Sequence, residues 1–484
     1  MKFMNRREFI HDSAALSALL AGLNQMPVQG KEKAKAVKKS DVNDQLRIAV
    51  VGVNGRGKEH VSGFAGRPDC VVATICDADE AVIGEAMRIA EKKQHKTPKF
   101  EQDIRKVMED KTIDIVSIAT PNHWHALAAI WAMQAGKDVY VEKPVSHNIS
   151  EGRRIVETAR MLNRICQTGT QIRSSTGVRE AMDFLHSGEL GKVQVSRGLC
   201  YKTRNSIGKV DGPQEPPKTM NYDLWCGPAP FKPPHRKTEH GTVHYDWHWF
   251  WDYGNGDLGN QGIHQMDVAR WGLGKNELAK SVISVGGRFG YVDDGQTANT
   301  QICVFDYGDS ELIFEVRGLK TDPYKNARVG NVFHCAEGYL VLGSYEGAIA
   351  FDPNGQVIKK FGGGGDHFSN FLQAVRSRKM EDLHADILEG HLSSALCHLG
   401  NISYRLGKPQ PFSQKSHAFG DDKEAYETLA RMEQHLKTNS VPLDQTSYQV
   451  GRKLAFDPKS ERLVHDKEAD AMLTREYRKG FEIS

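Results

Sequence analysis

The chain has 484 residues, of which 39% are hydrophobic and 26% charged, and its formal net charge is +3. That length exceeds what one hydrophobic core usually holds, so we expect two main domains. The small charge gives no argument for a nucleic-acid partner, and no apolar run approaches the roughly 20 residues of a membrane helix.

The first 40 residues have the composition of a targeting segment rather than of a folded element. A basic start that ends in Arg6 and Arg7 precedes a weakly apolar stretch over residues 14–23, and a lysine-rich stretch follows over 31–40. The pattern resembles a twin-arginine export signal, whose passengers leave the cytoplasm already folded. We therefore expect a periplasmic protein, tethered to the membrane if the segment is not cleaved. A disordered basic N-terminus is the alternative.

A glycine-rich turn between two buried strands is the strongest signal in the chain. The apolar runs at residues 46–51 and 71–76 predict strands, and Gly52-Val53-Asn54-Gly55-Arg56-Gly57 follows the first of them. Asp77 ends the second strand, twenty residues after Gly57. This order is typical of a dinucleotide-binding unit, in which the pyrophosphate lies at the N-terminus of the helix that follows the turn.

The residue types in this unit indicate which nucleotide it binds. A carboxylate at Asp77 would bind the ribose hydroxyls and repel a 2′-phosphate, so NAD is expected rather than NADP. Asn54 stands where the fingerprint has its middle glycine, but Asn tolerates left-handed backbone angles and Gly55 can take over the close approach. The expected cofactor contacts from this unit are Gly52, Asn54, Gly55, Arg56, Gly57 and Asp77.

Strand and helix patterns alternate regularly after the turn. Such alternation predicts a doubly wound parallel sheet, which we interpret as an α/β NAD-binding Rossmann domain over residues 41–168. Further strands are expected at 113–119, 138–141 and 165–168, and helices at 79–92, 123–135 and 149–162.

From residue 169 the pattern changes to strands that lie close together without helices between them. That spacing is typical of an antiparallel sheet, so we expect an α+β domain over 169–420, followed by a charged surface extension over 421–484. The expected strands are 193–199, 281–289, 301–305, 311–316, 332–335 and 339–341, and the expected helices are 178–186, 367–378 and 386–405.

Several short segments lie at characteristic places along these predicted elements. They are the glycine turn with Asp77, Thr120-Pro121-Asn122-His123-Trp124-His125, Glu142-Lys143-Pro144, residues 254–264 and residues 367–371. Together they resemble the Gfo/Idh/MocA oxidoreductases over most of residues 45–407, and the run from Trp247 to Asp252 is similar to a large exported subgroup. The resemblance implies a Rossmann domain and a second α/β domain whose open sheet carries substrate and often oligomer contacts. We therefore expect a homodimer or homotetramer.

The resemblance also implies where the chemistry lies. The lysine of Glu-Lys-Pro, here Lys143, would contact the reacting hydroxyl, where an ammonium favours a developing alkoxide. A histidine of the second domain, here His264, would exchange the hydroxyl proton, for which an unperturbed pKa near ~6.5 is suited. A solvated loop lysine and a buried histidine at a helix start are the alternatives. The further cofactor contacts that the family implies are Thr120, Pro121, Asn122, His125, Glu142 and Lys143 itself.

The chain departs from the family pattern four residues before that histidine. Many members carry an aspartate there, whereas this chain has Asn260. An amide can orient His264 by a hydrogen bond but supplies no negative charge to it. Asp257 or Asp267 could substitute for the missing carboxylate, or His264 could bind substrate only, with the base elsewhere.

An aromatic run supplies the expected carbohydrate contacts. Trp247, Trp249 and Trp251 alternate, so in a strand they would share one face. Aromatic faces stack on the C–H faces of sugars, which predicts a sugar platform with His248 and Asp252 as hydroxyl ligands, and core packing is the alternative. The expected substrate contacts are Lys143, Trp247, His248, Asp252, Asn260 and His264. Eight scattered cysteines and the pair His391 and His398 show no zinc spacing, so we assign no metal.

Export and cofactor use together favour a particular kind of enzyme. Free NAD is scarce outside the cytoplasm, so the cofactor has to travel tightly bound and be restored in each catalytic cycle. We therefore expect a carbohydrate oxidoreductase that converts a ring hydroxyl of a sugar or glycoside to a keto-glycoside. The alternative is a redox-neutral NAD-dependent glycosidase or lyase, in which transient oxidation allows elimination of the aglycone. A cofactor-bound sugar-binding protein is a third reading.

Overall fold

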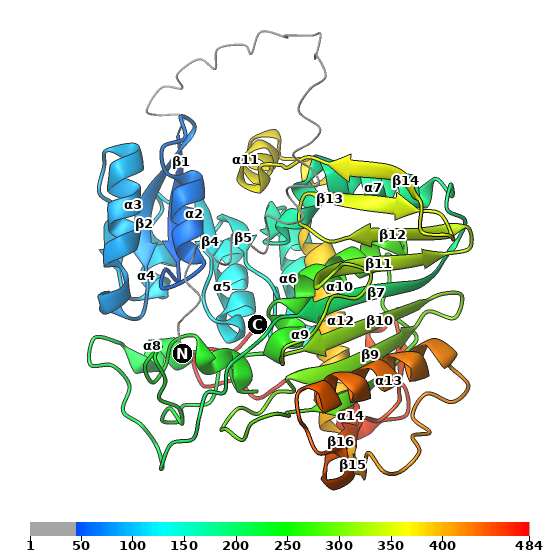
Figure 1. Ribbon diagram of the computed structural model, residues 1–484. Coiled ribbons are helices and arrows are strands. Elements are labelled where there is room, and N and C mark those ends of the chain that lie inside the picture. Colours follow the sequence, from blue (N-terminus) through cyan, green and yellow to red (C-terminus); the bar gives the residue numbers. More distant parts are fainter. Residues whose placement is uncertain (1–44, 484) are drawn as a thin grey trace. The chain divides into compact units, whose positions relative to one another are not determined.

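The computed structural model describes residues 45–483, so the predicted export signal and linker over residues 1–40 lie outside the described part. This part begins with a six-stranded parallel sheet in the order β3-β2-β1-β4-β5-β6 (Figure 1). That order defines a dinucleotide-binding Rossmann fold and confirms the predicted doubly wound sheet. Its elements are β1 (Leu46–Val51), α2 (Gly57–Phe64), β2 (Cys70–Cys76), α3 (Gly84–Gln94), β3 (Lys99–Glu101), α4 (Ile104–Glu109), β4 (Ile115–Ile118), α5 (Asn122–Gln134), β5 (Asp138–Val141), α6 (Ile149–Met161) and β6 (Cys166–Thr168).

Alternate residues of β1 pack in different cores. Ile48 and Val50 pack in a cluster with α2 and α3, whereas Ala49 and Val51 pack in one with α5 and α6. Successive side chains of a strand point to opposite faces, so a strand covered by helices on both sides has to be apolar throughout. The first cluster also contains Phe371 of α11 (His367–Ser377), a helix from much later in the chain.

A second sheet of twelve strands follows, mostly antiparallel, with the path β14-β13-β12-β11-β7-β10-β9-β8-β16-β15. The pair β10 and β7 is parallel, and β17 pairs with β8 off this path. The sheet strands are β7 (Val193–Tyr201), β8 (Ser281–Gly287), β9 (Thr300–Asp306), β10 (Glu311–Arg317), β11 (Val329–Cys335), β12 (Gly338–Leu342), β13 (Gly347–Phe351), β14 (Val357–Gly362), β15 (Lys408–Pro411), β16 (Ser447–Val450), β17 (Leu454–Asp457) and β18 (Arg462–Leu463). The remaining helices are α7 (Thr176–His186), α8 (Tyr222–Cys226), α9 (Gly256–Gly259), α10 (Gly262–Gly272), α12 (Ile387–Arg405), α13 (Lys423–Thr438) and α14 (Lys467–Ala471).

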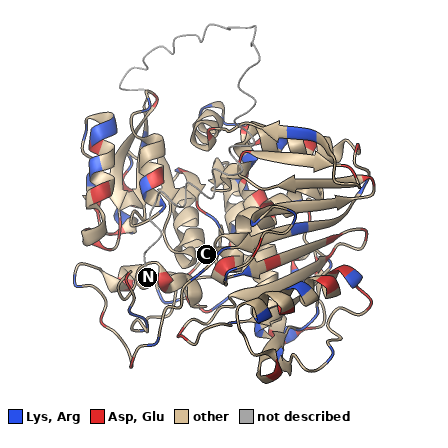
Figure 2. Cartoon of the chain, viewed as in Figure 1, with Lys and Arg blue, Asp and Glu red and all other residues tan. Residues whose placement is uncertain are grey.

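Helices cover both faces of the second sheet at β8 and β9. Val282 packs in one cluster with Leu396 of α12, and its neighbour Ile283 packs in another with Leu429 of α13. Charged residues of both signs lie along α13 (Figure 2), while Leu429 and Met432 of the same helix are buried. The extension predicted as charged surface therefore adds a buried layer to the sheet.

The last described residues return to the first sheet. The carbonyl oxygen of Leu473 accepts a hydrogen bond from Ser150 N–H at 2.9 Å, and the ring of Phe481 lies 5.7 Å from Trp124 and 6.3 Å from Trp131 of α5. The described residues 45–483 belong to one compact unit, so the domain boundaries at 168/169 and 420/421 stay predictions. Between residues 45 and 483, every helix is too short or too polar to cross a membrane.

Candidate functional site

A cavity of about 710 Å³ lies at the carboxyl ends of the parallel strands. Ligands of doubly wound folds bind at this edge of the sheet. One wall comes from the predicted cofactor residues Gly52, Asn54, Gly55, Arg56, Asp77, Thr120, Pro121, Asn122, His125, Glu142 and Lys143. The other wall comes from α10 and from connections between the later elements, and it includes Trp247, His248, Asn260, Gln261, His264 and Tyr345.

The glycines of the turn after β1 have different roles. Gly52 has φ +83°, and a Cβ there would lie 2.7 Å from the Ala119 carbonyl group. A Cβ on Gly57 would lie 1.8 Å from the Gly52 carbonyl oxygen, so Gly57 is needed for packing although it does not line the cavity. A Cβ on Gly55 would meet nothing within 4 Å, which leaves open space where a pyrophosphate can approach the backbone. The turn fits a dinucleotide.

Asp77 at the end of β2 fixes the turn as well as facing the cavity. Its carboxylate accepts hydrogen bonds from the backbone N–H of Val53 at 2.7 Å and of Asp79 at 3.1 Å. Burial raises the pKa of Asp77, and these two donors act in the opposite direction. The carboxylate therefore holds the phosphate-binding turn against the strand whose end would carry the ribose.

Glu142 is the buried centre of a second set of contacts. Its Oε1 accepts from Arg56 Nε at 3.0 Å and from Gln171 Nε2 at 3.1 Å, and His60 Nε2 lies 3.1 Å away. Burial acts to raise the pKa of Glu142, but the hydrogen bond with His60 and the charges of Arg56 and Lys143 hold it well below its usual range. An ionised carboxylate therefore stands beside Lys143.

The predicted catalytic pair, Lys143 and His264, lines this cavity. Lys143 Nζ donates to the carbonyl oxygen of Asn260 at 2.9 Å, and His264 lies in the first turn of α10 with its ring 5.4 Å from that of Tyr345. His264 Nδ1 is buried and has no hydrogen-bond partner in the described chain. Burial lowers the pKa of Lys143, and burial with the nearby Lys143 charge lowers that of His264 well below its usual value.

No carboxylate pairs with His264 within residues 45–483. The Asn260 side chain forms no hydrogen bond there, and its contacts come from the backbone, whose N–H donates to the Gly256 carbonyl oxygen and whose carbonyl oxygen accepts from Lys143. Asp257 is held by Arg204 at 2.7 and 2.8 Å, and Asp267 by Arg173 at 2.7 and 2.9 Å. Neither aspartate therefore pairs with His264 in place of the missing carboxylate.

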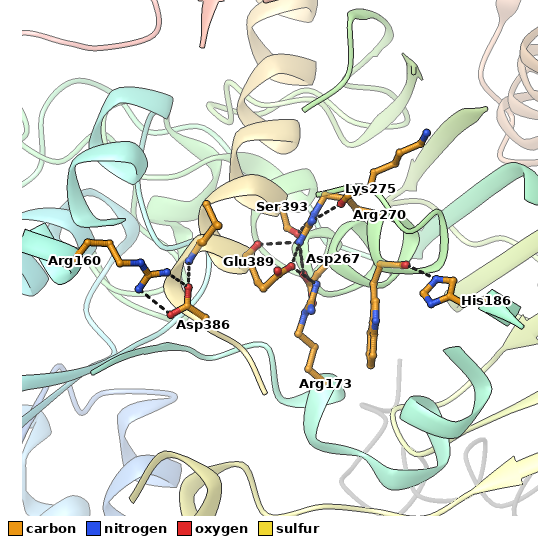
Figure 3. Close-up of polar contacts among 11 residues, drawn as sticks. Arg160, Arg173, His186, Asp267, Arg270, Lys275, Asp386, Glu389 and Ser393 are labelled. Atoms are coloured by element: carbon orange, nitrogen blue, oxygen red, sulfur yellow. Dashed lines mark hydrogen bonds and ion pairs between the residues drawn. The ribbon is translucent and has the colours of Figure 1, made fainter. Parts of the chain in front are cut away.

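Asp267 instead belongs to a buried ionic cluster that anchors α10 (Figure 3). Its carboxylate also accepts from Ser393 Oγ of α12 at 2.7 Å, and Arg173 reaches Glu389 of α12 at 2.9 Å. Arg270 of α10 donates to Ser393 Oγ at 3.0 Å. Because His264 lies on α10, the cluster fixes the helix that presents this histidine to the cavity.

The aromatic run does not form the predicted strand, and this prediction was wrong. Residues 246–249 form a 3-10 turn, so the three tryptophans do not share a face. Trp247 stacks on His248 at 3.6 Å and both line the cavity, whereas Trp249 is buried and Trp251 lies under Arg405. Asp252 pairs with Lys232 at 2.9 Å and is not a lining residue.

Other contacts show how the wall near β4 and β5 is held. Asn122 donates to Asn255 Oδ1 at 3.0 Å, and the two ring nitrogens of His125 face the carbonyl oxygens of Pro144 and Thr120. Several lining residues were not predicted from the sequence. Gln261 lies within the family segment 254–264, and the others belong to no motif: Gln102, Gln171, Lys202, Arg204, Trp225, Glu239, His240, His244, Tyr245 and Tyr345. Two of them, Lys202 and Arg204, come just after β7. Their place at the end of a predicted strand is the one sequence feature that could have indicated them as site residues.

A Rossmann sheet whose glycine turn opens on a cavity with a lysine and a histidine defines a dinucleotide-dependent oxidoreductase. Residues 46–170 match the family model for the NAD-binding Rossmann fold of an oxidoreductase family, and residues 175–437 match its C-terminal alpha/beta domain. The chain belongs to the Gfo/Idh/MocA oxidoreductase family, and its cofactor is NAD.

Curated relatives match part of the chain. Over 203 residues it is 29% identical to a glycosyl hydrolase family 109 protein of Shewanella pealeana, covering 39% of this chain and 44% of that protein. Over 208 residues it is 26% identical to an alpha-N-acetylgalactosaminidase of Shewanella oneidensis, covering 40% and 45%. The chain thus spans less than half the length of these relatives.

Solved structures resemble most of the described fold. Levoglucosan dehydrogenase in complex with NADH and levoglucosan has a TM-score of 0.55 at 17% identity, covering 74% of this chain and 97% of that one. The WlbA dehydrogenase from Bordetella pertussis in complex with NADH and UDP-GlcNAcA has a TM-score of 0.53 at 18% identity, covering 74% and 95%. At these identities the likeness shows the fold.

Proposed function

We propose that this protein is a carbohydrate oxidoreductase with tightly bound NAD, which oxidises a ring hydroxyl of a sugar or glycoside to a keto-glycoside, with a second substrate or acceptor that takes up the two electrons and restores NAD. The observation that carries the proposal is the position of Lys143 and His264, which line one cavity with the glycine turn. Two structural neighbours whose names describe sugar dehydrogenases bound to NADH fit a carbohydrate substrate.

The chain's own residues have separate tasks in this reaction. The turn from Gly52 to Arg56, with Asp77, would hold the nucleotide, and NAD when bound supplies the two-electron oxidation at the sugar carbon. His264 takes the proton of the reacting hydroxyl, because its lowered pKa leaves the imidazole neutral near pH 7. The Lys143 ammonium, aimed by its bond to the Asn260 carbonyl, stabilises the developing oxygen charge.

Export and assembly belong to the same proposal. A twin-arginine signal over residues 1–40 would place the folded, NAD-loaded protein in the periplasm, cleaved or membrane-tethered. A homodimer or homotetramer is the proposed assembly. Subcellular fractionation and sedimentation of the full chain would test these two statements.

The second candidate is a redox-neutral NAD-dependent glycosidase, favoured by relatives named glycosyl hydrolase family 109. Transient oxidation of a ring carbon would acidify the neighbouring C–H, and elimination would release the aglycone and leave a double bond in the sugar. In a glycosidase water would add to that double bond before the electrons return to the sugar, and in a lyase the double bond would remain. The same cavity serves both reactions, because both begin with removal of the hydroxyl proton and oxidation of its carbon.

Incubation of NAD-loaded protein with aryl glycosides in deuterated water separates the two reactions. A keto product with intact aglycone supports the first, and aglycone release with deuterium beside the oxidised carbon supports the second. Lys143→Met and His264→Ala should each remove the activity while bound NAD is retained. Lys192→Met, at an exposed lysine paired with Asp309, is the control. Wild-type rates in both site variants would refute the site.

A further inference from the structure

Lys202 is a half-buried cation in the cavity without a carboxylate partner. Its Nζ donates to Gln261 Oε1 at 3.1 Å, and within residues 45–483 it forms no ion pair. Removing an ammonium from water is costly unless an opposite charge compensates it, so a carboxylate beside this half-buried ammonium would be favourable. Here only a neutral amide oxygen fills that place.

The other buried or half-buried charges on the cavity wall are paired or hydrogen-bonded, whereas Glu239, also on the wall, is exposed and lies 3.7 Å from His240 Nε2. Arg56 pairs with Glu142 at 3.0 Å, and Arg204 pairs with Asp257 at 2.7 Å. Asp77 accepts from backbone N–H groups at the phosphate-binding turn. With Lys143 assigned to the reacting hydroxyl, Lys202 remains as the cavity ammonium without an ion pair among the described residues, because the nearby carboxylate of Asp257 is held by Arg204.

The partner of Lys202 is held in one orientation. Gln261 Nε2 donates to Tyr345 Oη at 2.7 Å and to Gln265 Oε1 at 3.3 Å, which turns its amide oxygen toward Lys202. Gln261 follows Asn260, whose carbonyl oxygen accepts from Lys143 Nζ. Two adjacent residues therefore fix both ammonium groups on the substrate side of the cavity.

We propose that the substrate is an acidic sugar whose carboxylate pairs with Lys202 while Lys143 and His264 engage a ring hydroxyl. A uronic acid glycoside has this chemistry, since it carries one carboxylate on a hydroxylated ring. The inference rests on the proposed carbohydrate function and adds the substrate class. The substrate carboxylate would supply the ion-pair partner that Lys202 lacks among the described residues. A charge-assisted hydrogen bond between the two groups would give the selectivity for acidic sugars.

Binding to NAD-loaded protein tests the inference by calorimetry. The probes are the methyl glycosides of glucuronic, galacturonic and mannuronic acid, each compared with the methyl glycoside of glucose, galactose or mannose. At least one uronide should bind about 10-fold or more tightly than its neutral partner. That preference should disappear in Lys202→Met and persist in Lys202→Arg and in Lys192→Met, with thermal melting to confirm folding.

The outcomes separate this inference from the proposed function. Turnover of neutral glycosides with no preference for any uronide, or a preference that survives in Lys202→Met, would overturn the acidic-sugar inference and leave the oxidoreductase standing. Absence of both binding and turnover for all six sugars would overturn the two together.

Discussion

The ammonium group of Lys143 donates to the carbonyl oxygen of Asn260 at 2.9 Å, which joins the segment after β5 to the short connection between α9 and α10. His264 follows in the first turn of that helix. One hydrogen bond thus connects the two walls of the cavity beside the histidine. The protonation states of this lysine and histidine should set the pH range in which the protein works.

We expect kcat/KM to be level near neutrality. Burial lowers the pKa of His264 well below 6.5, so the imidazole is neutral and able to accept a proton there, and activity should fall only at lower pH. Burial also lowers the pKa of Lys143 from 10.5, so the alkaline fall should begin below that value. In Lys143→Arg the alkaline fall should disappear from the residual activity, because arginine keeps its charge to a pH of about 12. If the activity of that variant still falls at alkaline pH as in the wild type, the fall is due to a group other than Lys143.

Alanine at two glycines of the turn should affect different properties, stability at one and NAD affinity at the other. In Gly57→Ala the new Cβ would lie 1.8 Å from a backbone oxygen, so the turn must shift and the free energy of unfolding should fall. In Gly55→Ala the Cβ enters open space, so stability should be retained while NAD affinity falls about tenfold through lost backbone approach. Gly84→Ala, also in open space but remote from the cavity, is the control for urea unfolding and NAD titration. Unchanged NAD affinity in Gly55→Ala would place the pyrophosphate elsewhere.

Removal of the Asp267 charge should destabilise the protein. Asp267→Asn leaves the buried Arg173 with only Glu389 as a carboxylate partner, and breaking a buried ion pair costs about 3 kcal/mol. Urea unfolding should show this loss. Asp309→Asn, at an exposed carboxylate that pairs with the half-buried Lys275, should change little, because an ion pair with a solvated partner is weak. Equal effects of the two substitutions would contradict the anchoring role of the cluster.

Phe481→Ala should weaken the packing of the C-terminal segment on α5 and lower the free energy of unfolding. The ring is buried against Trp124 and Trp131, and losing a buried phenylalanine costs about 3 kcal/mol. Since Trp124 also lines the cavity, tryptophan fluorescence should change on NAD binding differently from wild type. Met161→Ala at an exposed position is the control, and a wild-type unfolding midpoint for Phe481→Ala would show that the tail adds no stability.

The first sheet and its turn could be predicted because their signals are local. β1 and β4 are short apolar runs, and the spacing from Gly57 to Asp77 brings an acid to the end of β2. The structure brings both Lys143 and His264 to the cavity, as the family motifs implied.

The parts of the fold and of the site that could not be predicted depend on contacts between residues far apart in sequence. β14 has mostly exposed side chains and carries no alternating pattern, so it is a strand only because β13 pairs with it. The tryptophan alternation indicates a strand, yet residues 246–249 form a turn held by tertiary packing. The engagement of Asp267 by Arg173, ninety-four positions away, has no local sequence signal.

Phe371 and Phe481 leave the ribosome late, yet Phe371 completes a core that includes β1 and Phe481 completes one that includes α5. During synthesis the Rossmann sheet and its helices therefore expose apolar surface until residue 481 has been made. Binding of NAD should follow translation rather than accompany it.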